Sequence, residues 1–168
     1  MLWFRFYART CRPQDEIAAQ IAMEHRLYYY GDLHVFGEYP SFMKAFQKER
    51  GIVLDITKED LQYLKEGCVD YIGISYYMSS TISSIETDDS IKVAGRFFTV
   101  ARNPYVEKSD WNWQIDPQGL RYSLNLLHQR YHKPIFVVEN GFGAYDKMEN
   151  GRYMISTESN ILRRIFWK

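Results

Sequence analysis

Apolar residues recur at helical spacing through much of the first third of the chain. The first such stretch begins at Pro13, repeats apolar residues four positions apart, and reaches about Tyr29. This spacing places the apolar side chains on one face and predicts an amphipathic helix. Gly31 and Asp32 follow, and we expect the helix to end there because both residues favour turns.

Two shorter helices are predicted next. Pro40 stands where a first helical position would lie, and an apolar face then continues up to Gly51. Thr57 has the side chain of a helix N-cap, and Gly67 is placed to close that helix. The pattern therefore predicts two short helices before the next strand.

The second half of the chain predicts a strand, a helix and a further strand. The strands are Val69–Ser75 and Pro134–Val138, and the apolar run of the second is typical of a parallel strand covered on both faces. Between them, Asp116 and Pro117 start a helix whose apolar stripe ends at Tyr131. This order indicates an α/β protein with adjacent parallel strands and a right-handed crossover. Residues 79–90 are rich in Ser, Thr and Asp and read as a long loop at the rim.

Glu139 follows the last predicted strand directly. Asn140 and Gly141 then supply turn chemistry, so the carboxylate is expected at the carboxyl end of a parallel strand. In α/β proteins that edge of the sheet carries binding and catalytic sites. The alternative is a strand-end carboxylate that is solvated or paired with an arginine.

The amino-acid composition argues against several classes of function. Lys+Arg and Asp+Glu balance at 21 each, so no basic surface is expected for nucleic acid or an anionic membrane. The two cysteines, Cys11 and Cys68, are too few for a disulfide framework or a metal cluster, which suggests a cytoplasmic protein without metal or cofactor. No apolar run approaches the ~18 residues of a membrane span. The 14 Tyr and 4 Trp suit a site that stacks sugar rings, although they could also fill a core.

Three segments resemble family 1 glycoside hydrolases, in the order that this family has. They are Glu139-Asn140-Gly141, the strand and tyrosine pair at residues 70–79, and the segment at residues 111–120 that enters a helix. The Ser-Tyr-Tyr-Met and Trp-Asn-Trp-Gln-Ile-Asp-Pro sequences are similar to the bacterial 6-phospho-β-glucosidase branch. The resemblance extends from about Tyr7 to Lys147.

The resemblance implies a partial (β/α)₈ TIM barrel, covering roughly the helix after strand 5 through strand 7. Residues 1–168 are expected to form a single incomplete domain, since a whole barrel needs roughly 250 residues. The family's Asn-Glu-Pro motif, which carries the acid/base, and its phosphate-binding segment do not occur in the sequence. Residues 148–168 depart from the family pattern, and one hypothesis is that a shifted reading frame produced this tail in a truncated gene product.

The implied activity is retaining hydrolysis of 6-phospho-β-glucosides. By resemblance, Glu139 is the nucleophile and Tyr77 orients it, while Trp113, Asn140 and Tyr76 bind substrate. Such a reaction needs a second carboxylate about 5–5.5 Å away as acid and base. The family more often has Asn where Ser75 stands, so Ser75 is a weaker candidate.

Two hypotheses remain open at the level of the sequence. The chain is either a catalytic part that works when the missing part of the barrel is supplied, or an inactive remnant that at most binds sugar or a partner. The expected partners are a phosphorylated β-glucoside and, for the protein itself, the rest of the barrel or a second copy.

Overall fold

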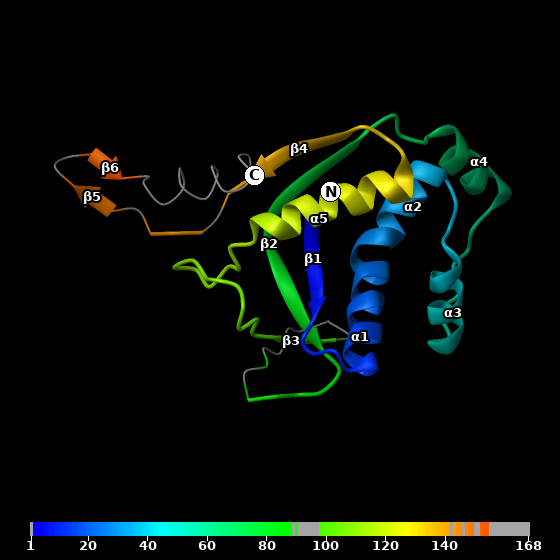
Figure 1. Cartoon of the computed structure of the whole chain (residues 1–168). Coiled ribbons are helices and arrows are strands. Elements are labelled where there is room, and N and C mark those ends of the chain that lie inside the picture. Colours follow the sequence, from blue (N-terminus) through cyan, green and yellow to red (C-terminus); the bar gives the residue numbers. More distant parts are fainter. Residues whose placement is uncertain are drawn as a thin grey trace.

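The computed structural model describes most of the chain as a mainly parallel four-stranded sheet packed against helices, with a separate two-stranded antiparallel sheet towards the C-terminus (Figure 1). The described residues are 2–88, 90, 98–141, 143–145, 147–149 and 152–154. The elements are β1 (Leu2–Ala8), α1 (Pro13–Met23), the π-helix η1 (Glu24–Tyr28), α2 (Tyr29–Phe36), α3 (Ser41–Glu49), α4 (Lys58–Glu66), β2 (Ile72–Ser83), β3 (Thr99–Ala101), α5 (Pro117–Tyr131), β4 (Ile135–Asn140), β5 (Lys147–Glu149) and β6 (Arg152–Met154). Most of the tail after residue 147, including residues 155–168, lies outside the described residues.

Strand β2 is the centre of the sheet. It pairs in parallel with β1 on one side and with β4 on the other, and β3 pairs antiparallel with its end. The predicted adjacency of the two later strands, with α5 between them in the chain, is confirmed. The prediction missed β1, because Arg5 places a charge in its apolar run. The guanidinium is accommodated by a hydrogen bond to the Phe6 carbonyl and by the rings of Tyr7 and Tyr122, which lie 4.6 and 4.3 Å from it.

Strand β2 is also longer than predicted. The polar composition of residues 79–90 predicts a loop from Ser79 onward, but the strand continues to Ser83. Ser79, Ser80 and Thr81 are buried, and they pair with β1 from Arg5 onward. The expectation was wrong because pairing with β1 and β3 overrides the low strand propensity of serine.

The first helical run passes the predicted stop. It continues through α1, η1 and α2 to Gly37, which adopts a left-handed conformation with φ of 65°. Gly31 lies under Tyr131 of α5, where a β-carbon would come within 2.1 Å of the phenolic oxygen. Asp32 is buried and bonds to Arg130 and to the Tyr131 hydroxyl. Both residues therefore serve the contact between α2 and α5 and do not form a turn.

The helices α4 and α5 begin where the sequence predicts, and α3 begins one residue later. Thr57 and Asp60 form a reciprocal capping box at α4, and Gly67 is its C-cap. Asp116 caps α5 by accepting a hydrogen bond from the Gly119 amide at 2.8 Å. Pro40 stands one position earlier than expected, as the N-cap residue of α3. Within the described residues no helix combines the length and apolarity that crossing a membrane requires.

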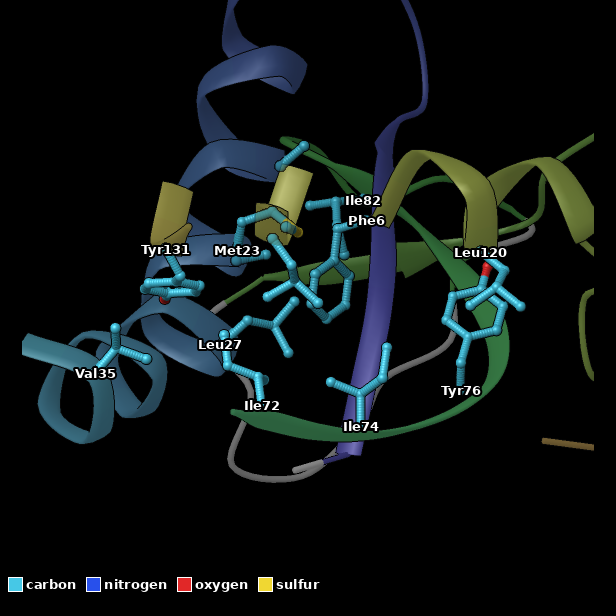
Figure 2. Packing of buried hydrophobic residues seen from close by; sticks show 13 residues of the cluster. Phe6, Met23, Leu27, Val35, Ile72, Ile74, Tyr76, Ile82, Leu120 and Tyr131 are labelled. Carbon is cyan, nitrogen blue, oxygen red and sulfur yellow. The ribbon is translucent and has the colours of Figure 1, made fainter. Parts of the chain in front are cut away.

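The core lies between β2 and the helices α1, η1, α2 and α5 (Figure 2). Alternate β2 side chains enter it, namely Ile72, Ile74 and Tyr76. Ile135 and Val137 of β4 also pack against it. The prediction that this last strand is covered on both faces is wrong, since Phe136 and Val138 are 61% and 48% exposed. One face of β4 touches the core, and the opposite face of the strand is open.

Candidate active site

Glu139 and Tyr77 meet on the open face of the sheet. The Tyr77 hydroxyl donates a hydrogen bond to Glu139 Oε2 at 2.6 Å. Glu139 comes from the end of β4, and Tyr77 comes from the neighbouring strand β2. Residues 62 positions apart are therefore brought together by the parallel pairing of these strands.

A β-bulge sets the direction of the Glu139 side chain. Ile74 pairs with Val137 and the next residue, Ser75, pairs with Glu139, so β4 carries one extra residue at this point. That extra residue is Val138. Regular alternation would turn Glu139 to the core side together with Val137, whereas the bulge places it beside Ser75 and Tyr77.

The surroundings of Glu139 favour its ionised form. Its pKa is lowered, first by the hydrogen bond from Tyr77 and then by one from Ser75. The same contact raises the pKa of Tyr77, because that hydroxyl donates its proton toward a carboxylate. Glu139 is exposed, so a ligand could reach it. Ser75 thus supports the carboxylate, a role that its short side chain did not suggest in the sequence.

Two tryptophan side chains, Trp113 and Trp111, lie beside this pair. The ring centroid of Trp113 lies 5.6 Å from that of Tyr77, with the rings edge to face. Trp111 meets Trp113 in the same manner, also at 5.6 Å. The Trp111 amide donates a hydrogen bond to the Gly143 carbonyl at 3.3 Å. This bond connects the two tryptophans to the segment that follows β4. Trp111 is half exposed and was not among the candidates of the sequence analysis.

Asn140 and Tyr76 occupy different environments from Glu139. The Asn140 amide nitrogen donates to the Tyr76 carbonyl at 2.7 Å, while its Oδ1 is buried without a partner among the described residues. The Tyr76 side chain is 1% exposed, and its hydroxyl bonds to the Asp116 carbonyl at 3.2 Å. Burial raises the pKa of Tyr76 well above the usual range. The structure thus places the side chain of Tyr76 in the core, apart from Glu139, and the predicted sugar contacts of both residues stay predictions.

The arrangement of Glu139 and its neighbours suits nucleophilic chemistry. A carboxylate that is exposed, ionised and held in direction by hydroxyl groups can attack an electrophilic carbon. The neighbouring indole rings offer apolar faces of the kind that stack on sugars. Across the part of the chain that the structure describes, no three His, Cys, Asp or Glu side chains gather in the way that a metal site requires.

Comparison with known proteins identifies similar sequences and folds. The sequence model described as Glycosyl hydrolase family 1 matches residues 5–162, which extends past Lys147. The chain is 43% identical to the aryl-phospho-beta-D-glucosidase BglH of Bacillus subtilis, over 94% of this chain and 33% of that protein. It is also 43% identical to a 6-phospho-beta-glucosidase of Dickeya chrysanthemi, over 89% of this chain and 31% of the relative.

Solved structures agree on the fold. A beta-glucosidase from Exiguobacterium marinum superposes with a TM-score of 0.81 at 23% identity, covering 99% of this chain and 37% of that one. The family 1 beta-glucosidase from Thermotoga maritima gives a TM-score of 0.78 at 19% identity, with 98% and 35% covered. The chain therefore spans about a third of the length of the proteins that it matches. Its fold is part of their α/β barrel, with a parallel sheet and covering helices.

Proposed function

Because the chain belongs to glycosyl hydrolase family 1, we propose that it carries the nucleophile of a retaining site for 6-phospho-β-glucosides. The observation that supports this most directly is the 2.6 Å hydrogen bond from Tyr77 to Glu139 at the end of a parallel strand. The resemblance named Glu139 as nucleophile and Tyr77 as its orienting partner. The contact has the direction and the effect on the Glu139 pKa that these roles require.

The proposed reaction runs in two steps. In the first, a Glu139 oxygen forms a bond to the anomeric carbon while the bond from that carbon to the leaving oxygen breaks. A second carboxyl group, protonated at this stage, gives its proton to the leaving oxygen and becomes a carboxylate. In the next step that carboxylate removes a proton from water, whose oxygen attacks the anomeric carbon and releases Glu139. The Tyr77 hydroxyl keeps the Glu139 carboxylate ionised and aimed between turnovers.

The phosphorylated sugar is proposed from the relatives. The two relatives described above, from Bacillus subtilis and Dickeya chrysanthemi, are named as phospho-β-glucosidases, and the chain covers about a third of each. We assign the 6-phosphate to residues outside this chain, and we assign the sugar ring to the surface beside Glu139 and Trp113. The proton-donating carboxylate is assigned to the part of the barrel that carries the Asn-Glu-Pro motif in the family.

A covalent trap tests the nucleophile. In 2,4-dinitrophenyl 2-deoxy-2-fluoro-6-phospho-β-glucoside the leaving group departs as dinitrophenolate without needing a proton, and the fluorine slows release of the sugar. The chain would be incubated with this reagent alone and after mixing with the remaining part of a relative's barrel. We expect one added fluoro-sugar phosphate per chain by intact mass, located on Glu139 by peptide mapping.

Two variants test whether the reagent labels Glu139 specifically. Glu139→Gln keeps the shape but removes the nucleophile, so labelling should fall by about a hundredfold or more. Glu66→Gln is the matched control, because Glu66 is an exposed carboxylate at the end of α4 that accepts a hydrogen bond from Gln62, and its labelling should equal the parent's. An adduct on a residue other than Glu139 would refute the assignment. The absence of any adduct, alone or in the mixture, would favour the inactive remnant.

A further inference from the structure

Two buried hydrogen bonds fasten the segment before α5 to strand β2. Ser79 Oγ donates to Gln114 Oε1 at 2.9 Å, and both side chains are almost completely buried, at 0% and 5% exposure. Residues 79 and 114 also form an isolated β-bridge. Two residues further on, the Asp116 carbonyl accepts from the Tyr76 hydroxyl. The Trp113 segment is therefore anchored to the strand that carries Tyr77.

This anchor lies next to the aromatic contact at the site. Trp113 precedes Gln114 directly, and Tyr77 lies two positions before Ser79. The same two segments thus meet twice, through the Ser79–Gln114 bond and through the rings of Tyr77 and Trp113. The Tyr77 ring also lies near Gly141, where a β-carbon would be 4.0 Å from the ring. The ring is therefore close both to Trp113 and to the backbone that follows Glu139.

We propose that Gln114 is a positioning residue for Glu139. Its bond to Ser79 holds Trp113 against the Tyr77 ring, and the Tyr77 hydroxyl is thereby kept on the Glu139 carboxylate. The role of Glu139 as nucleophile rests on the proposed function, whereas the contacts from Gln114 to Glu139 are present in the structure itself. Loss of the anchor would free Trp113 and let the Tyr77 ring turn away from the carboxylate.

Loss of the Tyr77 hydrogen bond can be measured as a change in the protonation of Glu139, so the test does not require enzyme turnover. A diazo ester reagent modifies a carboxyl group only in its protonated form, and peptide mass spectrometry assigns the product to Glu139. Labelling would be followed against pH in the parent chain, in Gln114→Leu, in Ser79→Ala and in Tyr77→Phe. Gln118→Leu is the matched control, because this glutamine is exposed on the first turn of α5.

We expect the Glu139 profile to move to higher pH in Gln114→Leu and Ser79→Ala. On the alkaline side of the midpoint, labelling should rise about threefold, because a higher pKa leaves more of the carboxyl group protonated at a given pH. Gln118→Leu should match the parent. In a Tyr77→Phe background, Gln114→Leu should add no further shift, because the effect passes through the Tyr77 hydroxyl. General loosening of the fold would not show that dependence.

Three results would contradict either the positioning role or the proposed function. An unchanged Glu139 profile in Ser79→Ala, which deletes only one hydroxyl, contradicts the positioning role even if Gln114→Leu fails to fold. An equal shift with and without Tyr77 would show that Gln114 acts by another route. Failure of the fluoro-sugar trap with a positive result here would reject the proposed function and leave the positioning role intact.

Discussion

At the residue scale, Tyr76 and Tyr77 are neighbours in the chain with opposite environments. Tyr76 is buried against Asp116 and α5, and Tyr77 stands on the open face with Glu139. Strand alternation separates them, and the bulge in β4 brings Glu139 to the side of Tyr77. A one-residue change in pairing would therefore remove the contact on which the proposed chemistry depends.

Replacing Tyr77 by Phe should shift the titration of Glu139. The hydrogen bond lowers the pKa of Glu139 by stabilising the anion, so its loss should raise that pKa toward the ordinary 4.5. As the pH is lowered, any process that needs the Glu139 anion should then decline at a higher pH than it does in the parent. The diazo labelling profile measures the shift. Tyr71→Phe, at an exposed tyrosine before β2, is the control, and an equal profile in Tyr77→Phe and the parent would contradict the contact.

At the element scale, single buried carboxylates join helices and strands that are distant in sequence. Asp15 in the first turn of α1 accepts from Thr10 and from the amide and hydroxyl of Ser84, just past β2. Asp32 in α2 receives two bonds from Arg130 at 2.9 and 2.6 Å, and one from Tyr131. The Arg130 guanidinium also covers the Tyr28 ring at 4.3 Å. These contacts explain why polar residues occupy buried helix positions.

The Asp15 carboxylate should make stability depend on pH. Burial alone would raise its pKa, but the bonds from Ser84 and Thr10 outweigh burial and lower it from 3.8 to about 2. Because the folded pKa is the lower one, the stabilisation is complete above pH 3.8 and is lost as the pH falls toward 2. The loss should be roughly 2 kcal/mol. Urea unfolding at several pH values should show this acid loss in the parent and a smaller one in Asp15→Asn.

The Asp32–Arg130 pair should show the cost of leaving a buried charge unpaired. Arg130→Met should destabilise the fold by about 3 kcal/mol, since Asp32 stays buried without its cation. Asp32→Asn together with Arg130→Met should recover part of that loss. The exposed pair Lys65–Glu38 is the control, and Lys65→Met should change stability by less than about 1 kcal/mol. Urea melts measure all four proteins, and equal losses in both single variants would contradict the argument.

At the scale of the whole molecule, the described sheet has open sides. Among the described residues, β1 and β4 each pair only with β2 along their lengths, and Phe136 and Val138 are exposed on the open face. Unpaired strand edges and exposed apolar surface both promote association between copies. In the related barrels, which are about three times as long as the matched chain, further chain is available to cover such surfaces.

The isolated chain should therefore self-associate. Sedimentation velocity at micromolar concentration should show species larger than a monomer. Phe136→Lys and Val138→Lys should each shift the distribution toward monomer, because a charge on the open face opposes stacking. Val53→Lys is the control, as Val53 is 92% exposed in a loop away from the sheet, and it should leave the distribution unchanged. A parent chain that sediments as a monomer at all concentrations would contradict this prediction.

The sequence by itself determined the features whose signals act within a few residues. The capping box at Thr57, the Asp116 cap with Pro117, the apolar stripe of α5 and the Glu139-Asn140-Gly141 motif all have local causes. The helix and strand signals were sufficient to predict the α/β class and the pairing of β2 with β4, and three segments together indicated the family by resemblance. The tertiary structure decided what depends on distant partners. Gly31 lies within a helix because the Tyr131 ring occupies the space that a side chain would need. Ser79 lies in a strand because it pairs with β1 and its hydroxyl donates a hydrogen bond to Gln114. The bulge that aims Glu139 at Tyr77 likewise arises only when two strands pair, since no local pattern specifies the extra residue.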